Sequence, residues 1–446
     1  MENRKPDRQQ PASNAPASEG LRALVTRNRR GEAVGVYAVC SAHPWVIDAA
    51  IQQAREDGSV LHVESTSSQV NQLGGYSGQT PQQFAAWLHK KAEEAGVAHD
   101  QILIGGDHLG PFPWRNSPAA EALSQARELV RACVLAGYSK IHLDTSMACA
   151  DDQSLDEETV AQRAAALCQS AEEAYAELPA GSPRLLYVAG TEVPAPGGES
   201  LPGEAPAVTS VEHVQRTLAT FRSAFAARGL QSAWERAIGL VVQPGVEFGE
   251  NSVFDYDRRK ERALVHALPA HPALVYEAHS TDYQKTEHLA EMVEDHFAIL
   301  KVGPWLTFAF REAVFALSMM ERELFGSRKD VQLSAVREAL DAAMVREPGQ
   351  WRSYYHGDEQ QIRLARAYSY SDRCRYYWHC PPVQQELERL LANLADTVIP
   401  GTLISQYLAP EYEALRAGTL RARAPELIQH HIRRILREYA SARRAR

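Results

Sequence analysis

Eight short runs rich in Val, Ile and Leu recur along the chain, and each closes on polar residues before a stretch with helical spacing. Near-continuous apolar runs of this kind are what parallel strands require when both of their faces are buried. A repeated order of strand and helix implies right-handed crossovers. Eight such units predict an α/β fold, a closed (β/α)₈ TIM barrel. The runs are residues 33–40, 60–64, 101–108, 140–146, 184–192, 237–243, 273–280 and 297–303.

The pattern changes after residue 303, where longer helical stretches replace the short strands. These stretches are 305–326, 331–346, 383–396 and 411–445. At the other end, the first residues are rich in Pro, Ala, Ser and Asn and lack the apolar segment of a signal peptide. We therefore divide the chain into three parts. They are a disordered N-terminal tail at 1–20, the barrel at 21–320, and a helical C-terminal extension packed on the barrel at 321–446.

Composition excludes several classes of function. The formal net charge of −9 over 446 residues argues against a nucleic-acid partner, since such proteins present a basic face to phosphates. No apolar run approaches the roughly eighteen residues that span a bilayer. Six cysteines are too sparse for a disulfide framework, which favours a cytoplasmic location. The sequence has no phosphate-binding P-loop and no Gly-x-Gly-x-x-Gly turn between a strand and a helix, which argues against nucleotide-dependent transfer and nicotinamide chemistry.

Polar residues stand at the carboxyl end of almost every predicted strand. In a parallel barrel these ends surround one mouth, where the connecting loops converge. Any one of these residues could instead be a cap or a turn residue. As a set they predict a functional site at the mouth. They are Ser41, His43, Glu64, Asp107, His108, Asp144, Glu192, Gln243, Glu247, Glu277, His279, Asp282 and Lys301.

Histidines and acids together at the mouth could hold a divalent metal ion. Imidazole suits zinc and other first-row metals, whereas carboxylate shifts the preference towards magnesium or manganese. His142 lies inside the fourth predicted strand, so we interpret it as a packed or hydrogen-bonded core residue. Cys374, His379 and Cys380 resemble a zinc cluster only weakly.

Three further segments allow two interpretations each. The glycine-bearing loops at 71–81 and 192–200 could bring backbone amides close to a sugar or phosphate, or they could be flexible lid turns. Segment 368–378 places aromatic residues beside Arg373 and Arg375. These arginines could bind a phosphate, since a guanidinium meets it with two hydrogen bonds. Alternatively, the segment packs the extension against the barrel.

Ten stretches of the sequence closely resemble the Z-subunit family of class II tagatose-bisphosphate aldolase (GatZ/KbaZ). The resemblance runs from about residue 21 to the end. The stretches are CSAHP (40–44), ESTSSQVNQLGGYSG (64–78), GGDHLGP (105–111), KIHLDTSMACA (140–150), GTEVPAPGG (190–198), VVQPGVEF (241–248), VYEAHSTDYQ (275–284), FAILKVGPWLTFAFREA (297–313), and the later SDRCRYYW and ISQYL.

The resemblance implies a (β/α)₈ barrel with a helical C-terminal part, and a role in galactitol, N-acetylgalactosamine or tagatose breakdown. Some members resemble non-catalytic partners that stabilise the catalytic subunit of D-tagatose-1,6-bisphosphate aldolase. Others are D-tagatose 6-phosphate 4-epimerases, which interconvert that sugar and D-fructose 6-phosphate. We expect the epimerase, acting by metal-assisted retro-aldol cleavage and re-addition, with the non-catalytic subunit as the alternative.

The resemblance to class II aldolases also implies roles for individual residues. Asp107 would be the acid/base, and His108 and His279 would be metal ligands. A third imidazole is not evident at the later strand ends, where Glu192 and Gln243 stand. We expect Glu277 as a further ligand, Asp144 and Glu192 as catalytic groups, and Zn, Mn, Mg, Co or Ni as the cofactor. The expected substrate-binding residues are His43, Glu64, Gln69, Asn71, Gln243, Asp282, Lys301 and Arg373.

Two kinds of partner follow from the same resemblance. The ligand would be a phosphorylated ketohexose. The protein partner would be a second copy of the chain, in a homo-oligomer, or the catalytic class II aldolase subunit.

Overall fold

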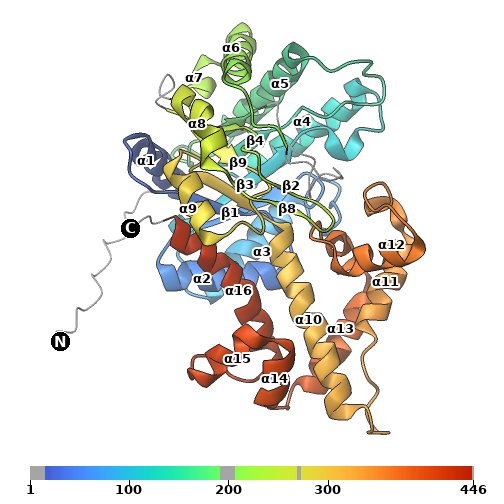
Figure 1. The fold of residues 1–446 in the computed structure, drawn as a ribbon. Helices are drawn as coiled ribbons and strands as arrows, with labels where there is room; N and C mark the ends of the chain where they lie inside the picture. The colour runs from blue at the N-terminus through green and yellow to red at the C-terminus, as the bar shows by residue number, and fades with distance from the viewer. Residues whose placement is uncertain (1–15, 191–205, 269–272, 444–446) are drawn as a thin grey trace, which may run out of the picture.

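The computed structural model describes residues 16–190, 206–268 and 273–443. Eight parallel strands form a closed barrel in the order β1-β10-β9-β6-β5-β4-β3-β2, which confirms the predicted (β/α)₈ fold (Figure 1). Each of the eight predicted runs overlaps one barrel strand, and β2 and β3 end one or two residues later than predicted. The strands are β1 (Val36–Val39), β2 (Leu61–Thr66), β3 (Ile102–Leu109), β4 (Lys140–Leu143), β5 (Leu186–Ala189), β6 (Ala237–Val241), β9 (Val275–Ala278) and β10 (Ile299–Val302).

Helices between the strands cover the outside of the barrel. α3 begins with Thr80, whose side chain accepts from the backbone N–H of Gln83 in a capping box, and Pro81 is its first residue. A short antiparallel pair, β7 (Glu247–Phe248) and β8 (Val253–Phe254), follows β6. The covering helices are α2 (Pro44–Asp57), α3 (Pro81–Glu94), α4 (Ala119–Leu135), α5 (Glu157–Tyr175), α6 (Val211–Ala227), α7 (Gln231–Trp234), α8 (Arg258–Ala267) and α9 (Thr286–Glu294).

A helix closes the amino-terminal end of the barrel. Its first residues fall within the segment that was predicted to be a disordered tail. α1 spans Ala17–Arg29, so residues 17–20 are helical, and the expectation that the tail reaches residue 20 is wrong. Leu21 and Val25 are buried in a small cluster with Leu103 and other residues of the strands. Burial of this apolar face explains the ordered helix. Residues 1–15 lie outside the described part of the chain.

The C-terminal extension is helical, as expected, but its last helix is interrupted. The predicted stretch 411–445 contains two helices, separated by a turn at Gly418, which has φ 72°. α10 begins at the barrel mouth and runs through the expected boundary at residue 320, so one helix belongs to both parts. The helices are α10 (Pro304–Phe325), α11 (Val336–Arg346), α12 (Glu359–Tyr368), α13 (Pro381–Leu394), α14 (Gly401–Tyr407), α15 (Ala409–Arg416) and α16 (Ala424–Ala442).

The last helix returns to the barrel. α16 packs against α2 and α9, and α10 lies beside it (Figure 1). The hydroxyl of Tyr439 on α16 donates to the carbonyl of Thr281, just after β9, at 2.7 Å. α10 and α16 therefore close the wall of the barrel between α9 and α2.

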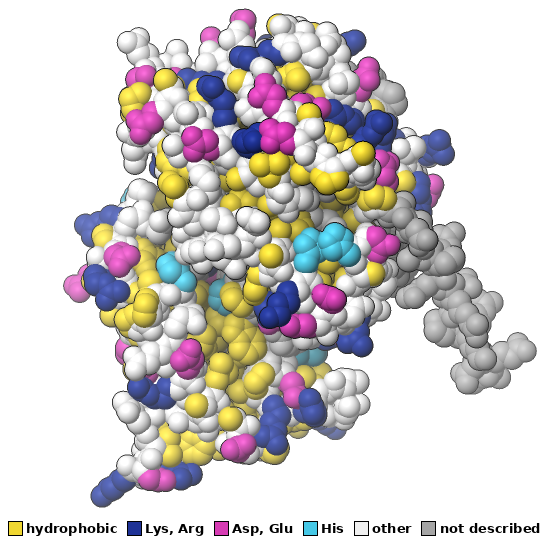
Figure 2. All heavy atoms as spheres, turned by 180° about the vertical axis from the view of Figure 1, so that it is seen from behind, with side chains coloured by type: hydrophobic (Ala, Val, Ile, Leu, Met, Phe, Trp, Pro, Cys, Tyr) yellow, Lys and Arg dark blue, Asp and Glu magenta, His cyan; other side chains and the backbone are white. Residues whose placement is uncertain are grey.

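The surface, the helices and the cysteines bear on the classes of function considered from composition. Figure 2 shows acidic and basic side chains interspersed over the described residues of one face, without a basic stripe. None of the described helices is long and apolar enough to cross a membrane. All six cysteines lie in the described residues and are free thiols.

Candidate functional site

The inside of the barrel carries charged and imidazole side chains where such barrels normally hold branched apolar residues. These side chains alternate along their strands, since residues i and i+2 point to the same face. Lys140, His142 and Asp144 follow this rule on and just after β4. His62 with Glu64 on β2, and Glu277 with His279 on and after β9, follow it as well. All seven are buried, and Lys140 contacts Glu64 and Glu277 across the barrel.

Three of these buried groups, Glu64, Lys140 and Glu277, form with Lys301 what we call the charge box. The Nζ of Lys140 lies 2.7 Å from Oε1 of Glu64 and 2.7 Å from Oε2 of Glu277. Lys301 pairs with Glu64 and lies 3.7 Å from Oε1 of Glu277. Burial alone would raise the pKa of Glu64, but the two ammonium groups lower it to about 2. Both carboxylates of the box therefore stay ionised.

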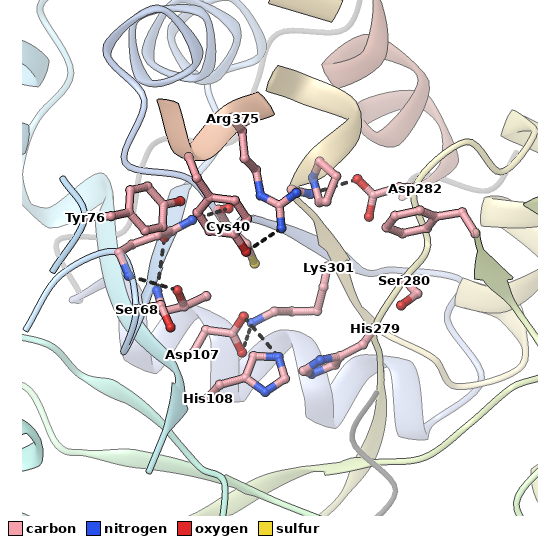
Figure 3. A pocket seen from close by; sticks show the side chains of 16 residues that line it. Cys40, Ser68, Tyr76, Asp107, His108, His279, Ser280, Asp282, Lys301 and Arg375 are labelled. Carbon is pink, nitrogen blue, oxygen red and sulfur yellow. Dashed lines mark hydrogen bonds and ion pairs between the residues drawn. The ribbon is translucent and has the colours of Figure 1, made fainter. Parts of the chain in front are cut away.

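Three imidazoles meet above the charge box. The ring centroids of His108, His142 and His279 lie 4.9 to 5.2 Å apart. Figure 3 shows His108 and His279 side by side, next to Asp107 and Lys301. His142 is buried and hydrogen-bonded, as predicted, and it also supplies the third imidazole that the strand ends did not reveal.

Part of this cluster could hold a metal ion. Asp107, His142, Glu277 and His279 each offer one ligand atom, and the four atoms lie within 4.8 Å of one another. Nε2 of His142 is buried and has no hydrogen-bond partner among the described residues. A buried polar atom without a partner is unusual, and a cation would satisfy it. Two imidazoles and two carboxylates suit zinc or another first-row divalent metal.

His108 lies beside these four residues, with its Nε2 3.8 Å from Oδ2 of Asp107, and its other ring nitrogen pairs with Asp144. Its Nδ1 lies 2.7 Å from Oδ2 of Asp144, and Oδ1 of that carboxylate accepts from the backbone N–H and hydroxyl of Ser146. Burial opposes charge on the imidazole, but Asp107 and Asp144 outweigh it and raise the pKa of His108. Such a pair fixes the orientation of an imidazole and favours its protonated form.

Asp107 lies between the imidazoles and the charge box. Its Oδ1 is 2.9 Å from Nδ1 of His142 and 2.9 Å from Nζ of Lys301. Burial would raise the pKa of this carboxyl, but Lys301, His108 and His142 hold it well below its usual range. Asp107 is therefore an ionised acceptor in the middle of the site.

Two glycines that flank Asp107 and His108 in the sequence are required by close packing. A Cβ on Gly105 would lie 2.8 Å from Cγ of Glu64, and one on Gly110 would lie 1.6 Å from the carbonyl oxygen of Asp144. His108 itself has φ 47°, a left-handed conformation that costs energy in a residue with a side chain. Its backbone N–H donates to Nδ1 of His142 at 3.1 Å. The end of β3 is thus shaped to fit the neighbouring strands.

The site opens into a cavity, which we call the mouth cavity. Arg375, on the short turn η5 (Arg373–Tyr377) of the extension, reaches into it from the side opposite the imidazoles (Figure 3). Oδ1 of Asp282 accepts from the backbone N–H groups of Gly303 and Trp305 at the start of α10. The cavity is lined by Cys40, Thr66, Ser68, Gln69, Tyr76, Asp107, His108, Phe248, His279, Ser280, Asp282, Lys301, Gly303, Pro304, Arg375 and Tyr376.

The other expected residues lie in several places. Gln69 lines the mouth cavity and donates to the carbonyl of Cys40 at 3.2 Å, whereas His43 lies against Phe310 in a neighbouring cavity. Asn71 accepts two backbone N–H groups within its own loop. Gln243 lines neither cavity.

Two further candidates named from the sequence, both in the extension, also lie away from the mouth cavity. Arg373 faces the ring of Tyr354 and donates to the carbonyl of Gln350 at 2.8 Å, so Arg375 takes the place at the mouth. Cys374, His379 and Cys380 form no group of metal-binding atoms within the described residues. Glu192 lies outside the described residues.

The residues missed from the sequence are Lys140 and Tyr76, together with the site role of His142, and the expectation of a substrate-binding residue chose Arg373 rather than Arg375 from the two arginines considered. The alternation Lys140, His142, Asp144 within one predicted strand was the available signal for two of them, since it puts all three on one face.

Comparisons with known proteins show which family and which solved structures this chain resembles. Residues 21–444 match the family model described as D-tagatose-1,6-bisphosphate aldolase subunit GatZ/KbaZ-like. The crystal structure of a probable tagatose 6 phosphate kinase from Sinorhizobium meliloti is 40% identical, with a TM-score of 0.83 over 92% of this chain and 100% of that one. A fructose-bisphosphate aldolase from Campylobacter jejuni is 12% identical, with a TM-score of 0.43 over 89% of this chain and 94% of that one.

Proposed function

This chain belongs to the GatZ/KbaZ-like family of D-tagatose-1,6-bisphosphate aldolase subunits, and from that premise we propose that it is a D-tagatose 6-phosphate 4-epimerase. The reaction interconverts D-tagatose 6-phosphate and D-fructose 6-phosphate. The name of the Sinorhizobium meliloti relative also contains tagatose 6-phosphate, which supports that substrate.

The observation that carries the proposal is the buried group at the barrel mouth. Asp107, His142, Glu277 and His279 can face one cation, and the pair of His108 and Asp144 lies beside them. Burying this many ionisable groups opposes folding unless each is paired. Their concentration at the carboxyl ends of the strands therefore supports catalysis rather than a purely structural role.

The chemistry follows from the position of carbon 4. In a 2-ketose this carbon lies one bond beyond the position that the carbonyl acidifies, so removal of its hydrogen gains no help from the ketone. Loss of the proton from the 4-hydroxyl instead breaks the bond between carbons 3 and 4 and leaves the electron pair on carbon 3. The new aldehyde turns, carbon 3 attacks its other face, and the proton returns to the oxygen.

We assign each of these steps to particular residues of this chain. We assign the proton on the 4-hydroxyl to the His108 imidazole, which Asp144 holds in position. Asp107 stays ionised and orients the imidazoles from within the ligand group. A divalent cation bound by Asp107, His142, Glu277 and His279 would polarise the ketone and stabilise the enediolate. This division differs from the sequence-based one, in which Asp107 moved the proton and His108 was a ligand.

The direct test is to incubate the purified protein with D-tagatose 6-phosphate and one divalent metal at a time, and to measure D-fructose 6-phosphate. Formation of fructose 6-phosphate is expected, and its absence with Zn, Mn, Mg, Co and Ni would contradict the proposal. In D₂O the product should carry no deuterium on carbon 4, because no hydrogen leaves that carbon. The variant H108Q should lose activity, and D341N, in an Arg366 pair on the extension, should keep it.

The alternative function is a non-catalytic subunit, which the family description favours because it names an aldolase subunit. A subunit of this kind would stabilise its catalytic partner without using the mouth. The two functions separate in one experiment, in which wild type and H108Q are each mixed with a catalytic class II aldolase subunit. Equal support of the partner's activity by both chains, without epimerase activity in either, would favour the subunit.

A further inference from the structure

A second hollow adjoins the mouth cavity, and we call it the side cavity. The two share five residues in their walls, so they are neighbouring compartments of one opening. They differ in size, with a volume of about 70 Å³ in the mouth cavity and about 380 Å³ in the side cavity. Ligand pockets are commonly some 300 Å³ or more, so most of a hexose-sized ligand has room only in the second compartment. The shared residues are Cys40, Gln69, Tyr76, Gly303 and Arg375.

The two compartments carry different charge. Of the described residues that line the side cavity, Arg375 alone has an Asp, Glu, Lys or Arg side chain. The mouth cavity contains the carboxylates of Asp107 and Asp282, and its Lys301 is already paired with three carboxylates. An anionic group on a ligand in the side cavity is therefore attracted to the Arg375 end.

The guanidinium of Arg375 is held in place without a charged partner. It donates to the carbonyls of Ser371 and Asp372 and to the hydroxyl of Tyr376, and it lies over the Tyr376 ring at 4.3 Å. Within the described residues no carboxylate lies at ion-pair distance from it. Asp282 and Asp372 interact with its charge from beyond ion-pair distance, so no carboxylate occupies its hydrogen-bonding positions, which suits phosphate recognition.

Two buried nitrogen atoms of the side-cavity lining also have no hydrogen-bond partner among the described residues. They are Nδ1 of His43 and Nε1 of Trp378, and the Trp378 side chain is 1% exposed. Burial lowers the pKa of His43 to about 3, so its ring is neutral and can donate one N–H. Unsatisfied buried donors are costly, and a ligand with oxygen acceptors would satisfy them.

We propose that the side cavity binds the phosphate-bearing end of the sugar phosphate, while its reacting carbons lie in the mouth cavity. The inference rests on the proposed function for the identity of the sugar. Arg375 meets the phosphate at the junction of the two compartments, and Trp378 and His43 supply further donors. The extension thereby provides the phosphate site and the barrel provides the chemistry.

The test measures binding, so it does not depend on turnover. Titration calorimetry with D-tagatose 6-phosphate, D-tagatose and inorganic phosphate gives three affinities for each chain. Wild type should bind the phosphorylated sugar far more tightly than the free sugar. R375Q should weaken the binding of tagatose 6-phosphate by about 10-fold to 100-fold, the range for loss of hydrogen bonds to a charged group, and leave the binding of tagatose unchanged.

Two further variants sharpen the result. W378F keeps an aromatic side chain but removes the Nε1 donor, so it should weaken the binding of tagatose 6-phosphate by several-fold. R328Q, an exposed arginine paired with Asp330 on the extension, is the matched control and should bind as wild type does. Equal weakening of tagatose and tagatose 6-phosphate by R375Q would overturn the phosphate site, as would failure of wild type to prefer the phosphorylated sugar. Tight, Arg375-dependent binding without epimerisation would instead refute only the proposed reaction.

Discussion

Two clusters of ionisable groups among the described residues invite comparison, one in the barrel and one in the extension. The charge box of Glu64, Lys140, Glu277 and Lys301 lies under the mouth cavity. The second group, which we call the helix clamp, joins α10, α15 and α16. His431 lies 3.1 Å from Glu411 and 3.1 Å from Glu312, and His430 lies 3.0 Å from Glu411. Both groups pair acids with bases across separate elements.

The two groups differ in what surrounds them. The charge box borders imidazoles, a left-handed histidine and a cavity, whereas the helix clamp joins three helices and lines no described pocket. A buried ion pair is weak evidence for stability, because desolvation offsets the attraction between the charges. We therefore expect changes near the charge box to affect catalysis and ligand binding, and changes in the helix clamp to affect stability alone.

The largest effect is expected from D107N, at the edge of the charge box. The amide cannot supply the ionised acceptor that Lys301, His108 and His142 stabilise in wild type. Epimerase activity should fall about 10³-fold to 10⁴-fold, or roughly 4–5.5 kcal/mol of transition-state free energy. Steady-state kinetics measures the loss, with D341N as control. Full activity in D107N would remove Asp107 from the mechanism.

The next effect is on stability. K140M leaves Glu64 and Glu277 without their shared ammonium, and uncompensated buried charge costs about 3–5 kcal/mol of unfolding free energy. Chemical denaturation measures it. The double variant E64Q/K140M should recover part of the loss, because one carboxylate is gone. K91M, in a half-exposed pair with Asp48, should cost less than about 1 kcal/mol.

A divalent metal should stabilise the chain through the barrel and not through the helix clamp. At one hundred times the dissociation constant, a bound cation raises the unfolding free energy by about 2.7 kcal/mol. Thermal unfolding with and without a chelator shows the shift. H142A should lose it, since His142 belongs to the ligand group, and H431Q should keep it. An unchanged shift in H142A would place the cation elsewhere.

The smallest effect is the pH dependence of the helix clamp. Burial disfavours protonated His431, but the hydrogen bonds to Glu312 and Glu411 outweigh it and raise its pKa to about 9 from 6.5. A raised pKa gives stability that is fully present below pH 6.5 and is lost as pH rises to about 9. Because Glu312 is partly exposed, we expect a loss of about 1–2 kcal/mol.

Denaturation at pH 6 and pH 9 measures this dependence, and H431Q should reduce it. Equal slopes in H431Q and wild type would show that the clamp histidine does not titrate with folding.

The strands were predictable because their signal is local, whereas side-chain partners were not. Each apolar run identifies its own strand without reference to the others. Arg373 and Arg375 are two residues apart in a tight turn, and only the packing of the extension decides which one faces the mouth. His142 read as a core residue because its neighbours Ile141 and Leu143 are apolar, and its meeting with His279 depends on closure of the barrel.

The return of α16 to the barrel has a consequence for synthesis on the ribosome. α16 begins at Ala424, yet it packs against α2, which is made nearly four hundred residues earlier in the chain. Until α16 has emerged, the apolar faces of α2 and α9 remain without this cover, and such exposed surface promotes aggregation of nascent chains. The outer cover of the barrel is therefore completed only at the end of translation, and a prematurely terminated chain carries its mouth residues in a barrel whose outer wall is incomplete.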